Sequence, residues 1–323
     1  MLFPHLCRFL AMQTILPKKL VPGATIGIIA PASPQRDTKR LERGISYLER
    51  LGFRVVCGEN LHSRHGGYLA GTDDERVADL HSMFADRRVD AVFCSRGGYG
   101  SGRLLPLINF DIIKKNPKIF VGFSDITALQ LAIFARTGLI TFSGAMPSVD
   151  MADGFDPFAE EWFWRVLQSA KPLGVIRQPK PKKVIKGGAA TGYLIPANLS
   201  VLCSIIGSGF LPKWNDKILL LEDIAEETYR IDRMLTQLRL AGILGSIQGL
   251  ATGYWSQSAS DRSTPHRDVH EMISENAGVV NGPVVRNICY GHEKKKLTVP
   301  VGIRAKLSAR GLGLTFLSAA VQA

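Results

Sequence analysis

Residues 118–129 constrain the fold of this chain most, because an apolar strand turns directly into a helix there. The run 119–121 is Ile-Phe-Val, the β-branched and aromatic composition of a buried strand. From Ile126 onward, apolar residues recur at helical spacing through Leu129 and Ile133. The sequence therefore predicts a strand, a sharp turn at Ser124 and a helix. Such a junction can push a serine hydroxyl out of a sheet.

Two interpretations of Ser124 follow from this turn. In the first, Ser124 is a nucleophile, and the N–H of Asp125, near the positive end of the helix, stabilises an oxyanion. In the second, Ser124 or Asp125 caps the helix by accepting hydrogen bonds from its first N–H groups. Ile126 stands where the usual nucleophile elbow has a second glycine, so these residues taken alone favour capping.

The first half of the chain alternates strands and helices. Strands are expected at 25–30, 53–56, 91–94 and 119–121, with helices between the first three. This alternation predicts an α/β fold with a parallel sheet, which binds ligands at the carboxyl ends of its strands. The glycine-rich loop 96–103 follows one such strand. Its spacing fits no nucleotide-binding motif, but Gly97 or Gly98 can supply a backbone N–H to an oxyanion.

The second half supplies an acid and a histidine. A hydrophobic strand at 217–223 ends on Glu222 and Asp223, and a strand at 284–290 leads to His292. A helix is expected at 229–241 and a hairpin at 303–317. We expect four regions: a start that is disordered or wrongly assigned (1–19), an N-terminal α/β domain (20–172), a Pro- and Lys-rich linker (173–186) and a C-terminal domain (187–323).

Ser124, Glu222 and His292 together form a set suited to nucleophilic catalysis. A serine hydroxyl is a poor nucleophile until a histidine takes its proton, and the histidine needs an acid to fix its tautomer. Each of the three is expected at the carboxyl end of a strand. Taken singly, Glu222 has the alternative of a surface ion pair or helix cap, and His292 that of an ordinary loop histidine.

Composition narrows the possible partners. The chain has 323 residues and a net charge of +12, but its basic residues are dispersed apart from 180–183 and 294–296, which we interpret as solvated faces. We therefore expect no nucleic-acid partner. No apolar run approaches the roughly 18 residues of a membrane helix. Five separated cysteines without a Cys-x-x-Cys pair suit reduced thiols in a cytosol, and we expect no metal.

Several short motifs in the chain form a recognisable set. They are Ile-Ile-Ala-Pro-Ala-Ser at 28–33, Arg-Gly-Gly-Tyr-Gly at 96–100 with Arg-Leu-Leu at 103–105, Gly-Phe-Ser-Asp-Ile-Thr-Ala-Leu at 122–129, Leu-Glu-Asp-Ile at 221–224, Tyr-Arg-Ile-Asp-Arg-Met-Leu at 229–235 and Tyr-Gly-His-Glu at 290–293. With these motifs the chain resembles the LD-carboxypeptidase family of serine peptidases, which includes murein tetrapeptide carboxypeptidases and microcin C resistance peptidases. The resemblance extends from about Gly23 to Leu314. One departure is 194–198, where many relatives have a glycine pair before Asn198.

The resemblance implies a flavodoxin-like N-terminal domain and a smaller, β-rich C-terminal domain, with the site between them. It implies Ser124 as nucleophile, His292 as general base and Glu222 as the orienting acid. The oxyanion hole would use the N–H of Asp125 and of Gly97 or Gly98. The implied protein is a cytoplasmic homodimer without a cofactor.

The implied activity is release of terminal D-alanine from murein tetrapeptides during peptidoglycan recycling. The third residue of the stem peptide, lysine or diaminopimelate, stays open. One alternative is a microcin C-type peptidyl-nucleotide hydrolase that gives self-immunity. Another is a non-catalytic binding module on the same fold.

Overall fold

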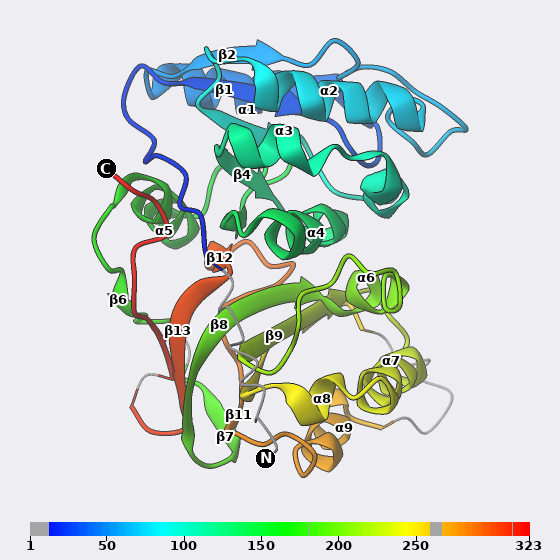
Figure 1. Cartoon of the computed structure of the whole chain (residues 1–323), viewed down its shortest axis with the longest axis vertical. Helices are drawn as coiled ribbons and strands as arrows, with labels where there is room; N and C mark the ends of the chain where they lie inside the picture. The colour runs from blue at the N-terminus through cyan, green and yellow to red at the C-terminus, as the bar shows by residue number, and fades with distance from the viewer. Residues whose placement is uncertain (1–12, 180, 259–266, 312) are drawn as a thin grey trace, which may run out of the picture.

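The computed structural model describes residues 13–179, 181–258, 267–311 and 313–323. Within these ranges the chain forms two sheets, one above the other in Figure 1, each flanked by helices. The first has the strand order β12-β5-β4-β3-β1-β2, and the second the order β6-β14-β13-β8-β9-β10-β11-β7. The predicted α/β class with an N-terminal parallel sheet is confirmed. No helix in the described ranges is both long and apolar enough to cross a membrane.

Strands β1 to β5 of the first sheet are parallel and follow the flavodoxin-like order 2-1-3-4-5. Helices cover both faces, so the central strands are buried throughout, which explains their unbroken apolar sequences. The strands are β1 Thr25–Ile29, β2 Arg54–Cys57, β3 Ala91–Cys94, β4 Ile119–Gly122 and β5 Thr141–Ser143.

The helices of this half fall into two groups. Tyr47 of α1 stacks on Trp164 of α5, while α2, α3 and α4 pack in sequence against one another. Helix α2 begins at a capping box, in which Thr72 and Glu75 bond each other's backbone N–H. The bounds are α1 Thr38–Arg50, α2 Asp73–Ala85, α3 Phe110–Lys115, α4 Thr127–Thr137 and α5 Pro157–Gln168, with the 3₁₀ helices η1 Ser101–Leu107 and η2 Ser124–Ile126.

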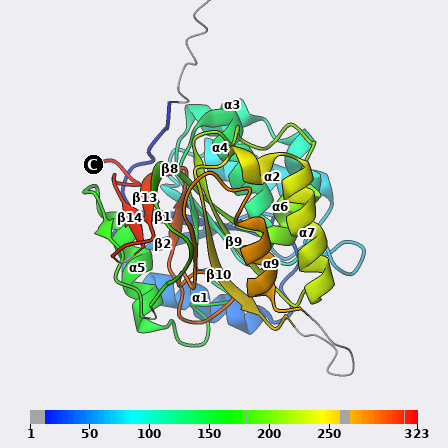
Figure 2. The same ribbon diagram turned by 90° about the horizontal axis from the view of Figure 1, so that it is seen from below.

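The second sheet is mixed. Its centre, β8 to β11, is parallel, and antiparallel strands flank it on both sides. The strands are β6 Gly174–Val175, β7 Lys183–Lys186, β8 Ala189–Asn198, β9 Lys217–Ile224, β10 Gly249–Ser256, β11 Val284–Arg286, β13 Ile303–Ser308 and β14 Leu314–Phe316. The helices are α6 Leu199–Ser204, α7 Thr228–Leu240, α8 Ile243–Ser246 and α9 Val269–Asn276; Figure 2 shows α7 and α9 beside β9 and β10.

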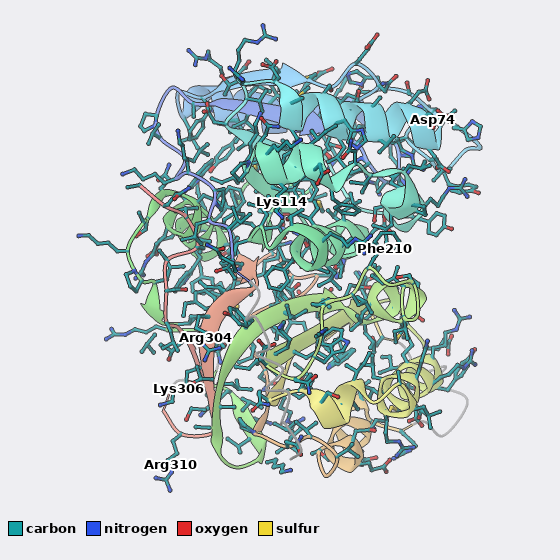
Figure 3. The ribbon with its side chains drawn as sticks, viewed as in Figure 1. Asp74, Lys114, Phe210, Arg304, Lys306 and Arg310 are labelled. Atoms are coloured by element: carbon teal, nitrogen blue, oxygen red, sulfur yellow. The ribbon has the colours of Figure 1, made fainter. Side chains whose placement is uncertain are left out.

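The predicted C-terminal hairpin is confirmed as the antiparallel pair β13 and β14. Residues along β13 alternate between buried and exposed, as a strand with one solvated face requires. Figure 3 shows the exposed side chains Arg304 and Lys306 projecting from this strand.

One strand crosses between the two halves of the chain. Strand β12, Val299–Val301, lies in the segment predicted as C-terminal, yet it pairs antiparallel with β5 at the edge of the first sheet. The predicted linker 173–186 likewise contributes β6 and β7 to the second sheet. The linker is therefore built into that sheet, and the division into two domains stays a prediction.

The expected disordered start is wrong for residues 13–19. Ile15 N donates to Gly138 O at 2.8 Å, and Ile140 N donates to Ile15 O at 2.9 Å. Further along, Lys19 N donates to Gln322 O at 2.9 Å. The segment is held by backbone hydrogen bonds on both sides, which its sequence does not reveal because its partners are remote in the chain. The prediction for residues 1–12 lies outside the described residues.

Candidate active site

Ser124 lies on a strained turn between β4 and α4. Its φ is +63°, in the left-handed region that serine rarely occupies, and a residue is held there only when the surrounding structure requires it. The capping interpretation is wrong. Neither η2 nor α4 has a side-chain cap, and within the described part of the chain the side chain of Ser124 makes no hydrogen bond. The hydroxyl is thus left available to a ligand.

The carboxylate of Asp125 points away from Ser124. Its Oδ2 accepts a hydrogen bond of 2.8 Å from the N–H of Ser101, at the start of η1. Burial raises the pKa of this carboxyl, against the opposing effect of the bonds from Ser101. Asp125 therefore ties the turn to η1 through its side chain, and only its backbone N–H is suited to the predicted oxyanion role.

Gly97 lies directly against the Ser124 turn. A Cβ placed on Gly97 would be 3.0 Å from both Ser124 Cβ and Phe123 O, and 3.4 Å from Asp125 N. These distances are tighter than ordinary Cβ contacts, so a side chain at position 97 would push the turn away, and glycine allows the loop after β3 to approach this closely. Gly97 and its neighbour Gly98 both line the cavity that Ser124 also lines.

His292 and Glu222 form a hydrogen-bonded pair. His292 Nδ1 lies 2.7 Å from Glu222 Oε2, and the Glu222 side chain is fully buried. The other carboxylate oxygen, Oε1, accepts a bond of 3.2 Å from Asn198 Nδ2. A carboxylate at Nδ1 fixes the tautomer in which Nε2 is free to accept a proton. The alternative of a surface ion pair for Glu222 is wrong, because the residue is not at the surface.

The backbone around both residues differs from the prediction. Glu222 lies inside β9, which continues to Ile224, rather than at its end. Strand β11 ends at Arg286, and Asn287, with a φ of +66°, turns the chain into a loop that carries His292. The apolar residues 288–290 that suggested a longer strand are instead buried loop residues.

Two aromatic residues position this loop. The hydroxyl of Tyr290 shares a hydrogen bond of 2.8 Å with Ser143 Oγ at the end of β5. The ring of Phe123, the residue before Ser124, lies 5.6 Å from the Tyr290 ring and 4.8 Å from the His292 ring between centroids. His292 is therefore packed against the turn that presents Ser124.

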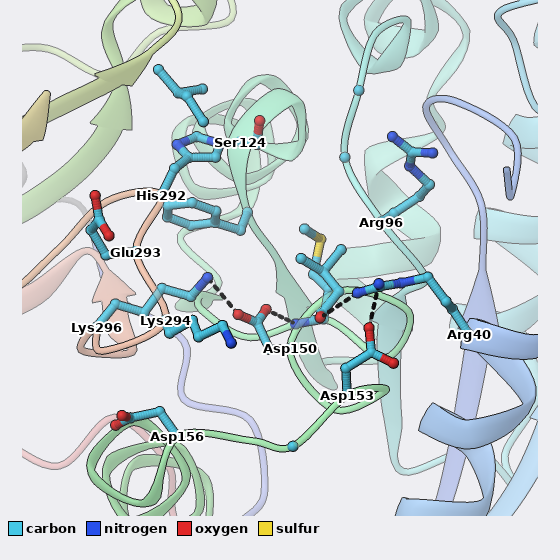
Figure 4. Close-up of a pocket in the computed structure, with 17 residues that line it drawn as sticks. Arg40, Arg96, Ser124, Asp150, Asp153, Asp156, His292, Glu293, Lys294 and Lys296 are labelled. Atoms are coloured by element: carbon cyan, nitrogen blue, oxygen red, sulfur yellow. Dashed lines mark hydrogen bonds and ion pairs between the residues drawn. The ribbon is translucent and has the colours of Figure 1, made fainter. Parts of the chain in front are cut away.

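A cavity of about 590 Å³ joins these parts. Gly97, Gly98 and Ser124 line it from the first half of the chain, and His292 from the second (Figure 4). Glu222 lies behind His292 and does not line the cavity. The structure thus places Ser124 and His292 at one cavity, with Glu222 bonded to His292, although Ser124 and His292 are 168 positions apart in the sequence.

Several charged residues of the cavity were missed. The run 294–296 was predicted as a solvated face, which is wrong for Lys296: the residue is buried, its Nζ is 2.7 Å from Asp150 Oδ1, and it lies 4.8 Å from the Phe123 ring centroid. Its position four residues after His292 is the signal that could have indicated a place in the site.

Two arginine side chains line the side of the cavity opposite His292 and Lys296. Arg40 pairs with Asp153, and Arg96 follows β3 immediately before Gly97 (Figure 4). The sequence showed Arg96 only as part of a glycine-rich motif.

The fold and the cavity define a class of α/β protein that has a serine on a strand-to-helix turn and a histidine–carboxylate pair at the same cavity. Such an arrangement is suited to hydrolysis with serine as the nucleophile. The comparisons narrow this class. The LD-carboxypeptidase N-terminal domain matches residues 26–144, and the LD-carboxypeptidase C-terminal domain matches residues 191–307. The chain belongs to the LD-carboxypeptidase family, a family of serine carboxypeptidases.

Named relatives support this membership. A probable murein peptide carboxypeptidase of Bacillus subtilis is 39% identical, over 90% of this chain and 91% of the relative. The microcin C7 self-immunity protein MccF of Escherichia coli is 29% identical, over 90% of this chain and 94% of the relative. The crystal structure of muramoyltetrapeptide carboxypeptidase from Oxalobacter formigenes matches with a TM-score of 0.80 and 30% identity, covering 93% of this chain and all of the other.

Proposed function

We propose that this protein is a serine carboxypeptidase that hydrolyses the L,D-peptide bond of murein tetrapeptides and releases the terminal D-alanine. The observation that carries the proposal is the bonded pair of His292 and Glu222, 2.7 Å apart, with its histidine at the cavity lined by Ser124. The murein peptide carboxypeptidases among the relatives support the substrate class. The physiological setting would be peptidoglycan recycling in the cytoplasm.

The first half of the reaction is acylation. Ser124 Oγ attacks the carbonyl carbon of the scissile bond while His292 Nε2 takes the hydroxyl proton. The resulting oxyanion accepts hydrogen bonds from the N–H of Asp125 and of Gly97 or Gly98. The C–N bond then breaks, His292 returns the proton to the leaving amine, and D-alanine departs from the acyl-enzyme.

The second half is hydrolysis of the acyl-enzyme. A water molecule attacks the ester carbonyl, His292 takes its proton, and the C–O bond to Ser124 breaks as the proton passes to Oγ. Glu222 holds the imidazole and stabilises its positive charge in both steps. Because the Ser124 hydroxyl makes no hydrogen bond to His292 within the described ranges, Ser124 Oγ and His292 Nε2 have to come within hydrogen-bonding distance when substrate binds.

One second function has a specific observation in its favour. The likeness to the microcin C7 self-immunity protein MccF supports hydrolysis of a microcin C-type peptidyl-nucleotide. The same nucleophile, base and acid would serve that reaction, so the two functions differ in what the cavity recognises. A binding module without catalysis is the third possibility, and only a measurement of turnover separates it.

The test is D-alanine release from a purified murein tetrapeptide, with Ser124→Ala as the control. We expect wild-type protein to release D-alanine and Ser124→Ala to release none above background. A peptidyl-nucleotide is assayed in parallel, since faster cleavage of that substrate would replace the first proposal by the second. Absence of turnover on both substrates would support the binding module. Assays with lysine and diaminopimelate peptides identify the preferred third residue.

We also propose that the protein acts as a homodimer, as the resemblance implies. Light scattering coupled to size-exclusion chromatography measures the mass directly. A mass of one chain at working concentration would contradict the dimer.

A further inference from the structure

Among the described residues, Arg96 has no carboxylate partner, although it lines the cavity of Ser124. Its one hydrogen bond runs from Nη1 to Pro34 O at 3.2 Å, and across the described ranges it makes no ion pair. A guanidinium has five N–H donors in a planar fork, so four remain for other partners. The fork matches the geometry of a carboxylate.

Two of the other cations that line the cavity, Arg40 and Lys296, are already paired. Arg40 forms an ion pair with Asp153, and its remaining groups donate to Ser148 O at 3.0 Å and Val149 O at 3.1 Å. Lys296 is 2.7 Å from Asp150. Figure 4 shows both ion pairs among the residues that line the cavity. Their charges are neutralised within the protein, which leaves little attraction for an incoming anion.

Lys294 also lines the cavity without an ion pair in the described part of the chain, but its surroundings differ. It is exposed, whereas Arg96 is half-buried. A charge in full contact with water interacts weakly with a ligand, and a half-buried one interacts more strongly. Arg96 is therefore the better anion site of the two.

The environment of Arg96 favours an anion. Burial lowers the pKa of Arg96, and the positive charges of Arg36 and Arg40 lower it further. A bound carboxylate would offset both effects, because it replaces lost hydration and balances the like charges.

Arg96 is also in the right place relative to the proposed chemistry. It directly precedes Gly97, whose backbone touches the Ser124 turn. Figure 4 shows Arg96 and His292 on opposite sides of the cavity that contains Ser124. A terminal amino acid bound between them has its scissile carbonyl near Ser124 and its own carboxylate within reach of a side chain on the Arg96 side.

We propose that Arg96 binds the C-terminal carboxylate of the peptide substrate and so restricts the enzyme to removal of one terminal residue. This inference rests on the proposed carboxypeptidase function. A peptide that continues beyond the first D-residue has no carboxylate at this position, and the neutral amide that takes its place cannot form the bidentate ion pair. Arg96 is thus a specificity-determining residue rather than part of the proton relay.

The experiment compares two substrates, a murein tetrapeptide ending in D-alanine and the same peptide ending in D-alanine amide. Because a charge-assisted pair contributes about 1.5–3 kcal/mol, wild-type kcat/KM should favour the acid by roughly 10- to 100-fold. Arg96→Gln should lose this preference, through a lower kcat/KM for the acid and little change for the amide. Arg96→Lys should restore part of it, since the charge returns without the planar fork.

Two control variants remove one positive charge elsewhere. Arg36→Gln changes an exposed residue outside the cavity, and Lys294→Gln changes the other cavity cation that lacks an ion pair. Both should keep the wild-type preference for the acid. Loss of the preference in Lys294→Gln, or its retention in Arg96→Gln, would overturn the assignment to Arg96. Circular dichroism and thermal unfolding confirm that each variant is folded.

A binding measurement keeps this inference separate from the proposed reaction. Calorimetric titration of Ser124→Ala and of Ser124→Ala/Arg96→Gln with the acid and amide peptides requires no turnover. Only the single variant should prefer the acid. If Ser124→Ala binds the acid peptide more tightly than the amide but wild-type protein releases no D-alanine, the proposed reaction is contradicted and the proposed carboxylate site is supported. Equal binding of acid and amide to Ser124→Ala would reject the site.

Discussion

At the scale of single residues, the buried carboxylate of Glu222 decides what His292 can do. Its two oxygens are both engaged, one by His292 Nδ1 and one by Asn198 Nδ2. Asn198 also donates to Asp223 Oδ1 at 2.8 Å, so the amide links two buried acids. This bonding fixes Glu222 in the one position from which it orients the imidazole.

Glu222→Gln tests this role. The substitution keeps the size of the side chain but removes the charge that stabilises the imidazolium and lets the amide select the wrong tautomer, so kcat should fall by roughly 10⁴-fold. Steady-state release of D-alanine measures it. Glu293→Gln is the matched control, because Glu293 also lines the cavity but bonds Ser256 Oγ at 2.8 Å. A similar loss in both variants would argue against a specific role for Glu222.

Asp125 gives a prediction about pH. Burial raises its folded-state pKa above the ordinary 3.8, so the folded protein binds a proton that the unfolded chain has released. Stability from this group is therefore greatest at low pH and decreases as pH rises from about 4 through the raised pKa. Asp125→Asn, which still can accept the bond from Ser101 N, should lack this decrease. Urea unfolding of both proteins between pH 4 and 7 measures the difference, which a pH-independent offset would contradict.

At the scale of elements, the turn at Ser124 and the loop that begins at Arg96 behave as one unit. Gly97→Ala should displace the turn, because the added Cβ would lie 3.0 Å from Ser124 Cβ. We expect a loss of about 1–3 kcal/mol in the free energy of unfolding, as for other overpacked sites, together with a lower kcat.

Gly102→Ala is the control for this prediction. Gly102 lies in the adjoining 3₁₀ helix η1, and its added Cβ would make ordinary contacts of 3.9 Å with Ala128 and Ile205. Urea unfolding and D-alanine release should both stay near wild type. Equal effects of the two substitutions would show that the close approach of Gly97 to Ser124 is not the cause.

The elements also show what sequence can predict. The strand–turn–helix at Ser124 follows from local patterns, because β-branched residues give way to helical spacing within a few residues. The loop that carries His292 does not, since burial of Ile288 and Tyr290 against remote parts of the chain mimics a strand pattern. Lys296 was misjudged for the same reason: its partner Asp150 is 146 residues away in the sequence.

At the scale of the whole molecule, the turn between β12 and β13 joins the two halves. Gly302, at this turn, has a φ of +88°, and a Cβ there would be 2.1 Å from the ring of Phe134 in α4. Gly302→Ala should therefore destabilise the protein by about 3 kcal/mol or more, from backbone strain and overpacking together. Urea unfolding measures the loss.

Gly207→Ala separates the two causes. Gly207 has a similar φ of +85°, but none of the described residues lies within 4 Å of an added Cβ, so only strain applies and the loss should be about 1–2 kcal/mol. If Gly302→Ala lowers the free energy of unfolding no more than Gly207→Ala does, overpacking against Phe134 is not a cause of the destabilisation.

The pairing of β12 with β5 sets an order of events during synthesis on the ribosome. Strands β1 to β5 are complete once residue 143 has emerged, but the strand that covers the edge of β5 ends only at Val301. Until then, the nascent chain exposes the unpaired backbone N–H and C=O groups of β5, which can form hydrogen bonds with other polypeptides. Truncated products that end between residues 143 and 301 lack the strand that covers this edge, so they are expected to depend on chaperones.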